Sequence, residues 1–219
     1  MTTIIKGCIF DLDGVICDTA KYHYLAWKRL ADNLCIHFTE SENELLKGVS
    51  RMKSLDILLG VSATSYTEQE KLQMATQKNE WYVDYIHQMT KAELNTGILD
   101  FISILKAENL KIALGSVSKN TSLILHKLEI EDLFNAIIDG NTVANAKPDP
   151  EVFLKAAESL ELPPENCIVF EDAISGVQAA HNANMKCVGV GSPVILNSAD
   201  YNIPDFKSIT FTTIKNALQ

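Results

Sequence analysis

The chain has 219 residues, of which 47% are hydrophobic and 21% are charged, with a formal net charge of −9. This is the composition of a globular protein with a sizeable core, and the negative charge argues against binding to nucleic acid or to an anionic membrane. The five cysteines form no CxxC pair, and the N-terminus has no signal-peptide pattern, so we expect a reduced, cytoplasmic protein without a membrane segment.

The first predicted strand, IIKGCIF at 4–10, leads directly into two aspartates, Asp11 and Asp13. Two like charges at the end of a buried strand repel each other, so a cation must offset the repulsion or one carboxyl must hold a proton. A calcium loop would place Ile9 and Ala20 at ligand positions, where both fail, and a helix cap needs only one carboxylate. We interpret the pair as an ionised nucleophile or metal ligand beside a proton carrier.

Residues 17–94 contain amphipathic helical patterns and no convincing strand. The helical patterns lie at 20–34, at 38–60 with an interruption around Gly48, and at 67–90. An all-helical block that follows the first strand is typical of an inserted domain. We therefore predict a helical insertion of 17–94 and an α/β core of 1–16 and 95–219, with a ligand site where they meet.

Short apolar runs alternate with helical patterns after this block. The runs lie at 111–117, 136–139, 167–172 and 186–191. This alternation predicts an α/β fold with a Rossmann-like, doubly wound parallel sheet that is covered by helices on both faces. The tail after Ser192 is less regular, and we predict one short strand at 209–212 followed by a terminal helix.

Two motifs that follow later strands favour an anionic ligand. GSVSKN at 115–120 supplies hydroxyls, backbone N–H groups and a lysine where a helix begins, which fits a phosphate cradle, although a simple capped turn has the same pattern. In AKPDP at 146–150, Lys147 precedes a proline and has an extended backbone. Its ammonium is either a fixed partner for carboxylates and phosphate or a solvated surface charge.

A third motif, FEDAISG at 170–176, adds Glu171 and Asp172 at the end of another strand. Carboxyl ends of parallel strands meet at one edge of a sheet, so these two carboxylates are expected to lie close to Asp11 and Asp13. Four acidic groups require a cation among them, and oxygen ligands without a nearby histidine favour Mg²⁺.

The order of these motifs, DxD, serine, lysine and ED, resembles the haloacid dehalogenase superfamily of phosphotransferases, and the helical insertion resembles its cap domain. The similarity extends to HYLAW at 23–27, LKGVSRMKSL at 46–55, KNEWY at 78–82 and SVSKN at 116–120. These segments resemble the members of the superfamily that move a phosphoryl group between two positions of one sugar phosphate.

This resemblance implies specific roles for the site residues. Asp11 is expected to be the nucleophile that becomes phosphorylated, and Asp13 the general acid and base. Mg²⁺ is expected on Asp11, the backbone carbonyl of Asp13, Glu171 and Asp172. The groups expected to bind the transferring phosphoryl are Ser116, the backbone of Val117, and Lys147. Those expected to hold a second phosphate are Arg51, Ser118, Lys119 and Asn120. Residues expected on the cap side are His23, Trp27, Lys47, Gly48, Val49, Ser50, Ser54, Lys78 and Asn79.

The implied activity is a Mg²⁺-dependent isomerisation of β-D-glucose 1-phosphate to glucose 6-phosphate, through an aspartyl phosphate and β-glucose 1,6-bisphosphate. The expected partners are small sugar phosphates, and the family suggests a monomer. Two alternatives remain open from the sequence: a sugar-phosphate phosphatase on the same scaffold, and a protein that binds phosphosugars without turning them over.

Overall fold

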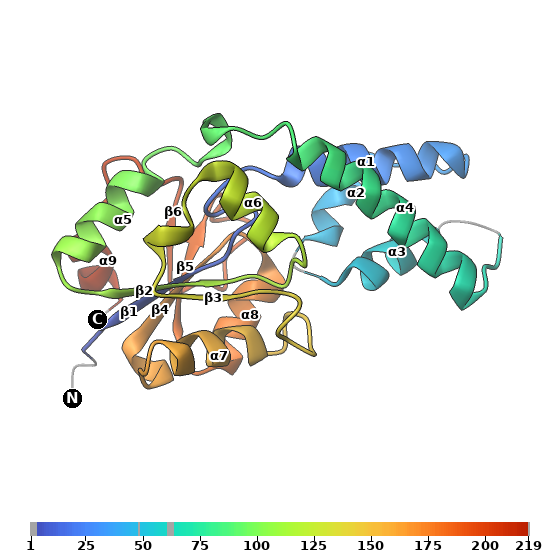
Figure 1. The fold of residues 1–219 in the computed structure, drawn as a ribbon. Helices are drawn as coiled ribbons and strands as arrows, with labels where there is room; N and C mark the ends of the chain where they lie inside the picture. Colours follow the sequence, from blue (N-terminus) through green and yellow to red (C-terminus); the bar gives the residue numbers. More distant parts are fainter. Residues whose placement is uncertain (1–3, 48, 61–63, 219) are drawn as a thin grey trace.

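The computed structural model describes residues 4–47, 49–60 and 64–218. Within these residues, six parallel strands form one sheet in the order β3-β2-β1-β4-β5-β6 (Figure 1). The strands are β1 (Gly7–Phe10), β2 (Lys111–Gly115), β3 (Ala136–Ile138), β4 (Cys167–Glu171), β5 (Lys186–Val190) and β6 (Tyr201–Ile203). The strand order reverses direction between β1 and β4, which is the switch point of a doubly wound sheet. The predicted fold class is confirmed.

Helices cover both faces of this sheet (Figure 1). One face packs against α5 (Ile98–Ala107), α6 (Thr121–Leu128) and α9 (Phe211–Ala217), and the other against α7 (Glu151–Ser159) and α8 (Ile174–Asn182). Short 3-10 turns lie at η1 (Glu44–Leu46), η2 (Lys91–Glu93), η3 (Glu131–Leu133) and η4 (Pro164–Asn166). Strands covered on both faces must be apolar at successive positions, and every residue of β1 and β4 is buried.

Aromatic rings fill the space between the sheet and α5. Phe10 of β1 stacks on Phe170 of β4 with ring centroids 4.6 Å apart and an interplanar angle of 7°. Phe101 and Phe206 pack against the same two rings. Because Phe10 and Phe170 each precede an acidic residue, this contact fixes the two strand ends that carry the acidic motifs.

The predicted strand at 209–212 is wrong. The Oγ1 of Thr210 accepts a hydrogen bond from the backbone N–H of Thr213 at 3.2 Å and caps α9, which begins at Phe211. Phe211 and Ile214 are both buried, and their spacing of three places them on one helical face. The cap and this spacing favour a helix, so the predicted terminal helix is present and includes Phe211 and Thr212. The last strand is instead β6 (Tyr201–Ile203), which is only three residues long.

The predicted helical block lies to one side of the sheet (Figure 1). Its helices are α1 (Ala20–Asn33), α2 (Glu40–Asn43), α3 (Arg51–Leu59) and α4 (Glu68–Ile86). They share a small core of their own, in which Trp27 and Leu30 pack with Leu55 and Leu58. The interruption expected at Gly48 concerns a residue outside the described ones, and the boundaries at 17 and 94 stay a prediction. No helix in the described ranges is long and apolar enough to span a bilayer.

Replacing Phe170 by alanine should lower the free energy of unfolding by about 3–5 kcal/mol, because the change leaves a cavity beneath the acidic motifs. Urea denaturation measures this loss. The matched control is Leu99→Ala on α5, where the side chain is 41% exposed and the expected loss is about 0.5 kcal/mol. Equal losses for the two variants would contradict the assignment of Phe170 to the core.

Candidate active site

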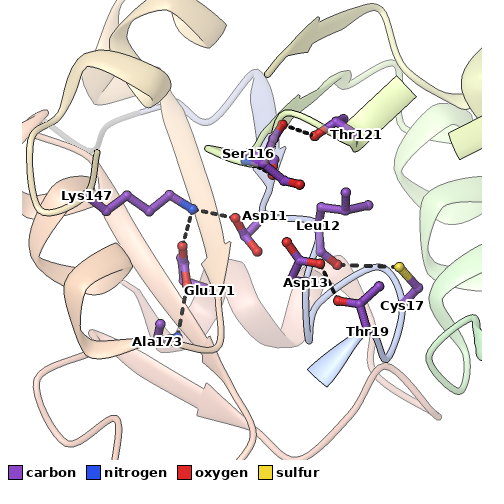
Figure 2. Close-up of polar contacts among 11 residues, drawn as sticks. Asp11, Leu12, Asp13, Cys17, Thr19, Ser116, Thr121, Lys147, Glu171 and Ala173 are labelled. Atoms are coloured by element: carbon purple, nitrogen blue, oxygen red, sulfur yellow. Dashed lines mark hydrogen bonds and ion pairs between the residues drawn. The ribbon is translucent and has the colours of Figure 1, made fainter. Parts of the chain in front are cut away.

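The two aspartates of the DLDG motif leave β1 into different surroundings (Figure 2). The backbone N–H of Asp11 donates to the carbonyl of Phe170 at 3.0 Å, and this bond continues the pairing of β1 with β4. The Asp11 carboxylate accepts a hydrogen bond from Lys147, and its side chain is 9% exposed. The Asp13 side chain is 31% exposed, and its carboxylate lies 4.0 Å from Nε2 of His23. The Asp11 carboxylate is therefore buried and paired with an ammonium, whereas the Asp13 carboxylate faces more open space.

Thr19 holds the Asp13 carboxylate. Its Oγ1 donates a hydrogen bond to Oδ1 of Asp13 (Figure 2). Thr19 stands at the N-cap position of α1 but makes no side-chain cap bond there, because its hydroxyl is turned to Asp13. The sequence does not reveal this contact, since a threonine before a helix has the pattern of an ordinary cap.

Carboxylates from the ends of β1 and β4 gather into one buried cluster. Oxygen atoms of Asp11, Glu171 and Asp172 all lie within 4.8 Å of one another. Lys147 contacts both Asp11 and Glu171, and Oε2 of Glu171 also accepts from the backbone N–H of Ala173 at 3.0 Å (Figure 2). On the cap side, Nζ of Lys47 lies 3.4 Å from Oδ2 of Asp172.

Burial governs the ionisation of this cluster. It raises the pKa of Asp11 well above its usual value, although Lys147 opposes the shift. Burial, followed by the charge of Glu171, raises the pKa of Asp172 to about 7. Burial alone would lower the pKa of Lys147, but Asp11 and Glu171 outweigh it and raise that pKa. The cluster thus retains protons that a divalent cation would displace, and its hard oxygen donors fit Mg²⁺.

Two glycines, which have no side chain, make room for these carboxylates. A Cβ atom on Gly14, which has φ +83°, would lie 2.1 Å from Oδ2 of Asp172. A Cβ on Gly176 would lie 1.9 Å from the Glu171 carboxyl. The motifs DLDG and EDAISG therefore contain glycine because a larger residue would push the neighbouring carboxylate away.

The segment after β2 forms a tight turn beside the cluster. Ser116 is fully buried, and its Oγ accepts from the backbone N–H of Ser118 at 3.1 Å. The Oγ of Ser118 accepts from the N–H of Asn120 at 3.2 Å, and Thr121 donates to the Ser118 carbonyl at 2.8 Å. The N-terminus of α6 is thereby held with its hydroxyls and backbone N–H groups next to Asp11, as a phosphate site requires (Figure 2).

A cavity of about 440 Å³ joins this edge of the sheet to the helical block. Its walls include Lys47, Val49, Ser50, Arg51 and Ser54 from the helical block. They also include Ser116, Val117, Ser118, Lys119 and Asn120 from the core. The Nδ2 of Asn120 donates to Oδ1 of Asn79 at 2.9 Å, a contact between the two parts of the chain. Asn43 also lines the cavity, and its buried Oδ1 has no partner among the described residues.

Lys78 is buried in the wall of this cavity. Its Nζ lies 3.0 Å from Nδ1 of His23 and 4.6 Å from the ring centroids of both Trp27 and Tyr82. Burial, followed by the charge of Arg51, lowers the pKa of Lys78 to about 7. Burial and Lys78 also lower the pKa of His23 well below its usual value. The site therefore contains an amine that changes charge near neutral pH.

Nearly all the residues expected at the site meet in this one place. All of them line the cavity except Lys147, which contacts Asp11 behind it, and Gly48, which lies outside the described residues. Their individual roles stay predictions. The sequence does not reveal Thr19 or Asn43, because nothing in their local pattern separates them from caps and core residues. Tyr82 ends the KNEWY segment, but its own pattern is that of a core aromatic residue.

The metal-free protein should lose stability as pH rises from about 4 to about 7. Asp172 has a pKa of about 7 when folded, against an ordinary 3.8, so the folded state binds more protons than the unfolded chain in this range. Thermal denaturation in EDTA measures the effect. Asp172→Asn should flatten the profile, and Mg²⁺ should restore stability at pH 8. The exposed Asp84→Asn should follow the wild type, and a flat wild-type profile would refute this account.

Comparisons with known proteins agree with this geometry. Residues 8–190 match the family model of the haloacid dehalogenase-like hydrolases. β-Phosphoglucomutase of Bacillus subtilis is 44% identical over 208 residues, which cover 94% of this chain and 92% of that protein. Phosphorylated carbohydrates phosphatase of Thermotoga maritima is 29% identical over 185 residues, which cover 83% of each chain.

A solved structure gives the same result. The crystal structure of β-phosphoglucomutase from Clostridium difficile has a TM-score of 0.92 and 42% identity, covering 98% of this chain and 97% of that one. The family match spans both the acidic motifs and the helical block between them. The chain therefore belongs to the haloacid dehalogenase-like hydrolase family.

Proposed function

We propose that this protein is a phosphomutase that interconverts β-D-glucose 1-phosphate and glucose 6-phosphate. The observation that carries the proposal is that two sets of side chains suited to binding phosphate line one cavity. Ser116 lies beside the acidic cluster, while Arg51 and Lys119 line the same cavity. A mutase needs two phosphate pockets, because its bisphosphate intermediate must present either end to the nucleophile. The similarity to two β-phosphoglucomutases supports the same activity.

In the proposed reaction, an oxygen of Asp11 attacks phosphorus, and the bond from phosphorus to the sugar oxygen breaks. Asp13 donates a proton to the departing sugar oxygen. In the other direction, Asp13 removes the proton from the sugar hydroxyl that attacks the aspartyl phosphate. Transfer to the 6-hydroxyl of β-glucose 1-phosphate gives the 1,6-bisphosphate. This intermediate turns round, returns its 1-phosphoryl to Asp11 and leaves as glucose 6-phosphate.

Charge neutralisation supports this assignment of roles. Asp11, the backbone carbonyl of Asp13, Glu171 and Asp172 would hold Mg²⁺, which would neutralise negative charge on the transferring phosphoryl group. Lys147 already pairs with Asp11 and Glu171, and its ammonium would also contact the phosphoryl group on Asp11. Arg51, with two parallel N–H donors, suits the second phosphate.

Closure of the helical block would protect the aspartyl phosphate from water. Asn79 on α4 and Asn120 at the start of α6 already meet across the cavity. Both line the cavity, so a phosphate bound there could replace their mutual hydrogen bond. We propose that the second phosphate of the sugar draws the two parts of the chain together.

A sugar-phosphate phosphatase is the second candidate, and the relative from Thermotoga maritima motivates it. The same Asp11, Asp13 and metal cluster would serve hydrolysis by water. The cations of the second pocket, above all Arg51, disfavour this candidate, since release of phosphate from a small monophosphate needs one pocket.

The proposed setting is the cytoplasm, and the proposed partners are sugar phosphates bound by a monomer. All five cysteines are free thiols, and four of them are buried. Free thiols suit a reducing compartment.

A coupled assay with separate anomers tests the proposed function. With Mg²⁺ and a glucose bisphosphate primer, the protein should convert β-glucose 1-phosphate to glucose 6-phosphate and leave the α-anomer largely unchanged. Release of inorganic phosphate, measured in parallel, should be much slower than isomerisation. Phosphate release that matches isomerisation would favour the phosphatase, and Arg51→Ala should then have little effect on small monophosphates.

Asp13→Asn should cripple transfer to and from the sugar, by about 10² to 10⁴ in kcat, because the variant carries no exchangeable carboxyl proton. Binding of Mn²⁺, followed by electron paramagnetic resonance, should survive, since only the backbone of Asp13 is expected at the metal. Asp11→Asn should abolish turnover altogether. An Asp13→Asn variant with normal kcat would remove the acid–base role.

A further inference from the structure

In the turn that follows Asp13, backbone hydrogen bonds within the turn satisfy only some of its carbonyl groups. The carbonyl of Leu12 accepts from the backbone N–H groups of Ile16 at 3.0 Å and Cys17 at 3.2 Å. The carbonyl of Cys17 accepts from the N–H of Gly14 at 2.8 Å. These bonds leave the carbonyls of Gly14, Val15 and Ile16 to be satisfied from outside the turn.

One residue, 80 positions away, supplies all three of these hydrogen bonds. The side-chain Nδ2 of Asn95 donates to the Gly14 carbonyl at 2.7 Å and to the Val15 carbonyl at 2.9 Å. Its backbone N–H donates to the Ile16 carbonyl at 3.0 Å. An asparagine amide carries two N–H donors, so both are used, and the reversed amide would set its oxygen against two carbonyls.

Asn95 also belongs to the second connection between the helical block and the core. Cys17 and Leu94 form an antiparallel bridge, and the N–H of Asp18 donates to the Glu93 carbonyl at 2.9 Å. The chain thus passes between the core and the helical block twice, once at residues 14–18 and once at 93–95. Asn95 in the second connection is bonded to the turn in the first.

We propose that Asn95 is a positioning residue for Asp13. It does not line the cavity of about 440 Å³, and it lies with Gly14 and Asp172 in the wall of a smaller pocket next to it. Its hydrogen bonds fix the turn that begins directly after Asp13. Gly14 directly follows Asp13. Its carbonyl accepts a hydrogen bond from Asn95, and its Cα packs against Asp172. Loss of the amide therefore frees the backbone between the proton carrier and the metal cluster.

A purely structural role would produce a different result. If Asn95 only stabilised the fold, its loss would reduce the amount of folded protein and leave each folded molecule fully active. If it positions Asp13, its loss must act through Asp13 and must vanish when Asp13 has no proton to transfer. The kinetic part of this distinction rests on the proposed function, and the structural part does not.

Amide hydrogen exchange tests the structural part without any substrate. In Asn95→Ala, the amides of Gly14, Ile16 and Cys17 should exchange about fivefold faster or more than in the wild type, because the turn opens more often. Asn95→Asp is isosteric but faces two carbonyls with a carboxylate, so its effect should be larger. Unchanged exchange at these amides in both variants would overturn the proposal.

A double-mutant cycle in the isomerisation assay tests the kinetic part. Asn95→Ala should lower kcat by about tenfold or more with little change in KM, and the same change in an Asp13→Asn background should lower it by about threefold at most. The matched control is Asn166→Ala, because the Asn166 amide donates to the Ile4 carbonyl at the opposite end of the sheet. That variant should retain normal kcat in both backgrounds.

The outcomes separate the two proposals. A wild-type protein that fails to isomerise β-glucose 1-phosphate overturns the proposed function, and the exchange experiment then decides the role of Asn95 alone. A wild type that isomerises, combined with equal effects of Asn95→Ala in both backgrounds, overturns the positioning role and leaves the proposed function intact.

Discussion

The ammonium of Lys147, held between Asp11 and Glu171, is the contact on which the rest of the site depends. Its side chain is 1% exposed, so two carboxylates and one amine share a space from which water is nearly excluded. An isolated charge at this depth would be costly, and each member is stable only because the others are present. With both carboxyls ionised, these three groups carry one excess negative charge before Asp172 is counted. The remaining charge is balanced either by a retained proton, as the raised pKa values of Asp11 and Asp172 indicate, or by a bound cation.

The sheet positions the first two carboxylates, and the loop between β3 and α7 supplies Lys147. β1 and β4 are neighbours at the switch point of the sheet, so their carboxyl ends place Asp11 and Glu171 side by side. The helical block then closes the space above them and adds the cationic groups. In a chain with a net charge of −9, this local gathering of Lys47, Arg51 and Lys78 is what makes an anionic ligand acceptable.

The sequence reveals most of this because short-range patterns and strand ends determine it. Unbroken apolar runs predict β1, β2 and β4, and the motifs follow them directly, so Asp11, Ser116 and Glu171 can be placed without coordinates. Long-range contacts cannot be found in this way. Asn95 reaches a turn 80 positions earlier, and Thr19 resembles an ordinary cap. In the tail, the predicted terminal helix is present, but the strand predicted before it is wrong, because burial of Phe211 and Ile214 selects a helix there.

The stacked rings of Phe10 and Phe170 have a consequence for the size of the metal site. They lock two neighbouring strands in register one residue before Asp11 and Glu171, on the opposite face. Adjacent strands lie about 4.8 Å apart, whereas two oxygens bound side by side to one Mg²⁺ at about 2.1 Å lie only about 3 Å apart, so the two side chains must converge from their strands. The spacing of the sheet thus sets the distance between the backbones of Asp11 and Glu171, and the ring contact on the opposite face holds that distance fixed. The two strand ends are therefore held at a constant separation, and a substitution in the apolar core would change that separation without altering any acidic residue.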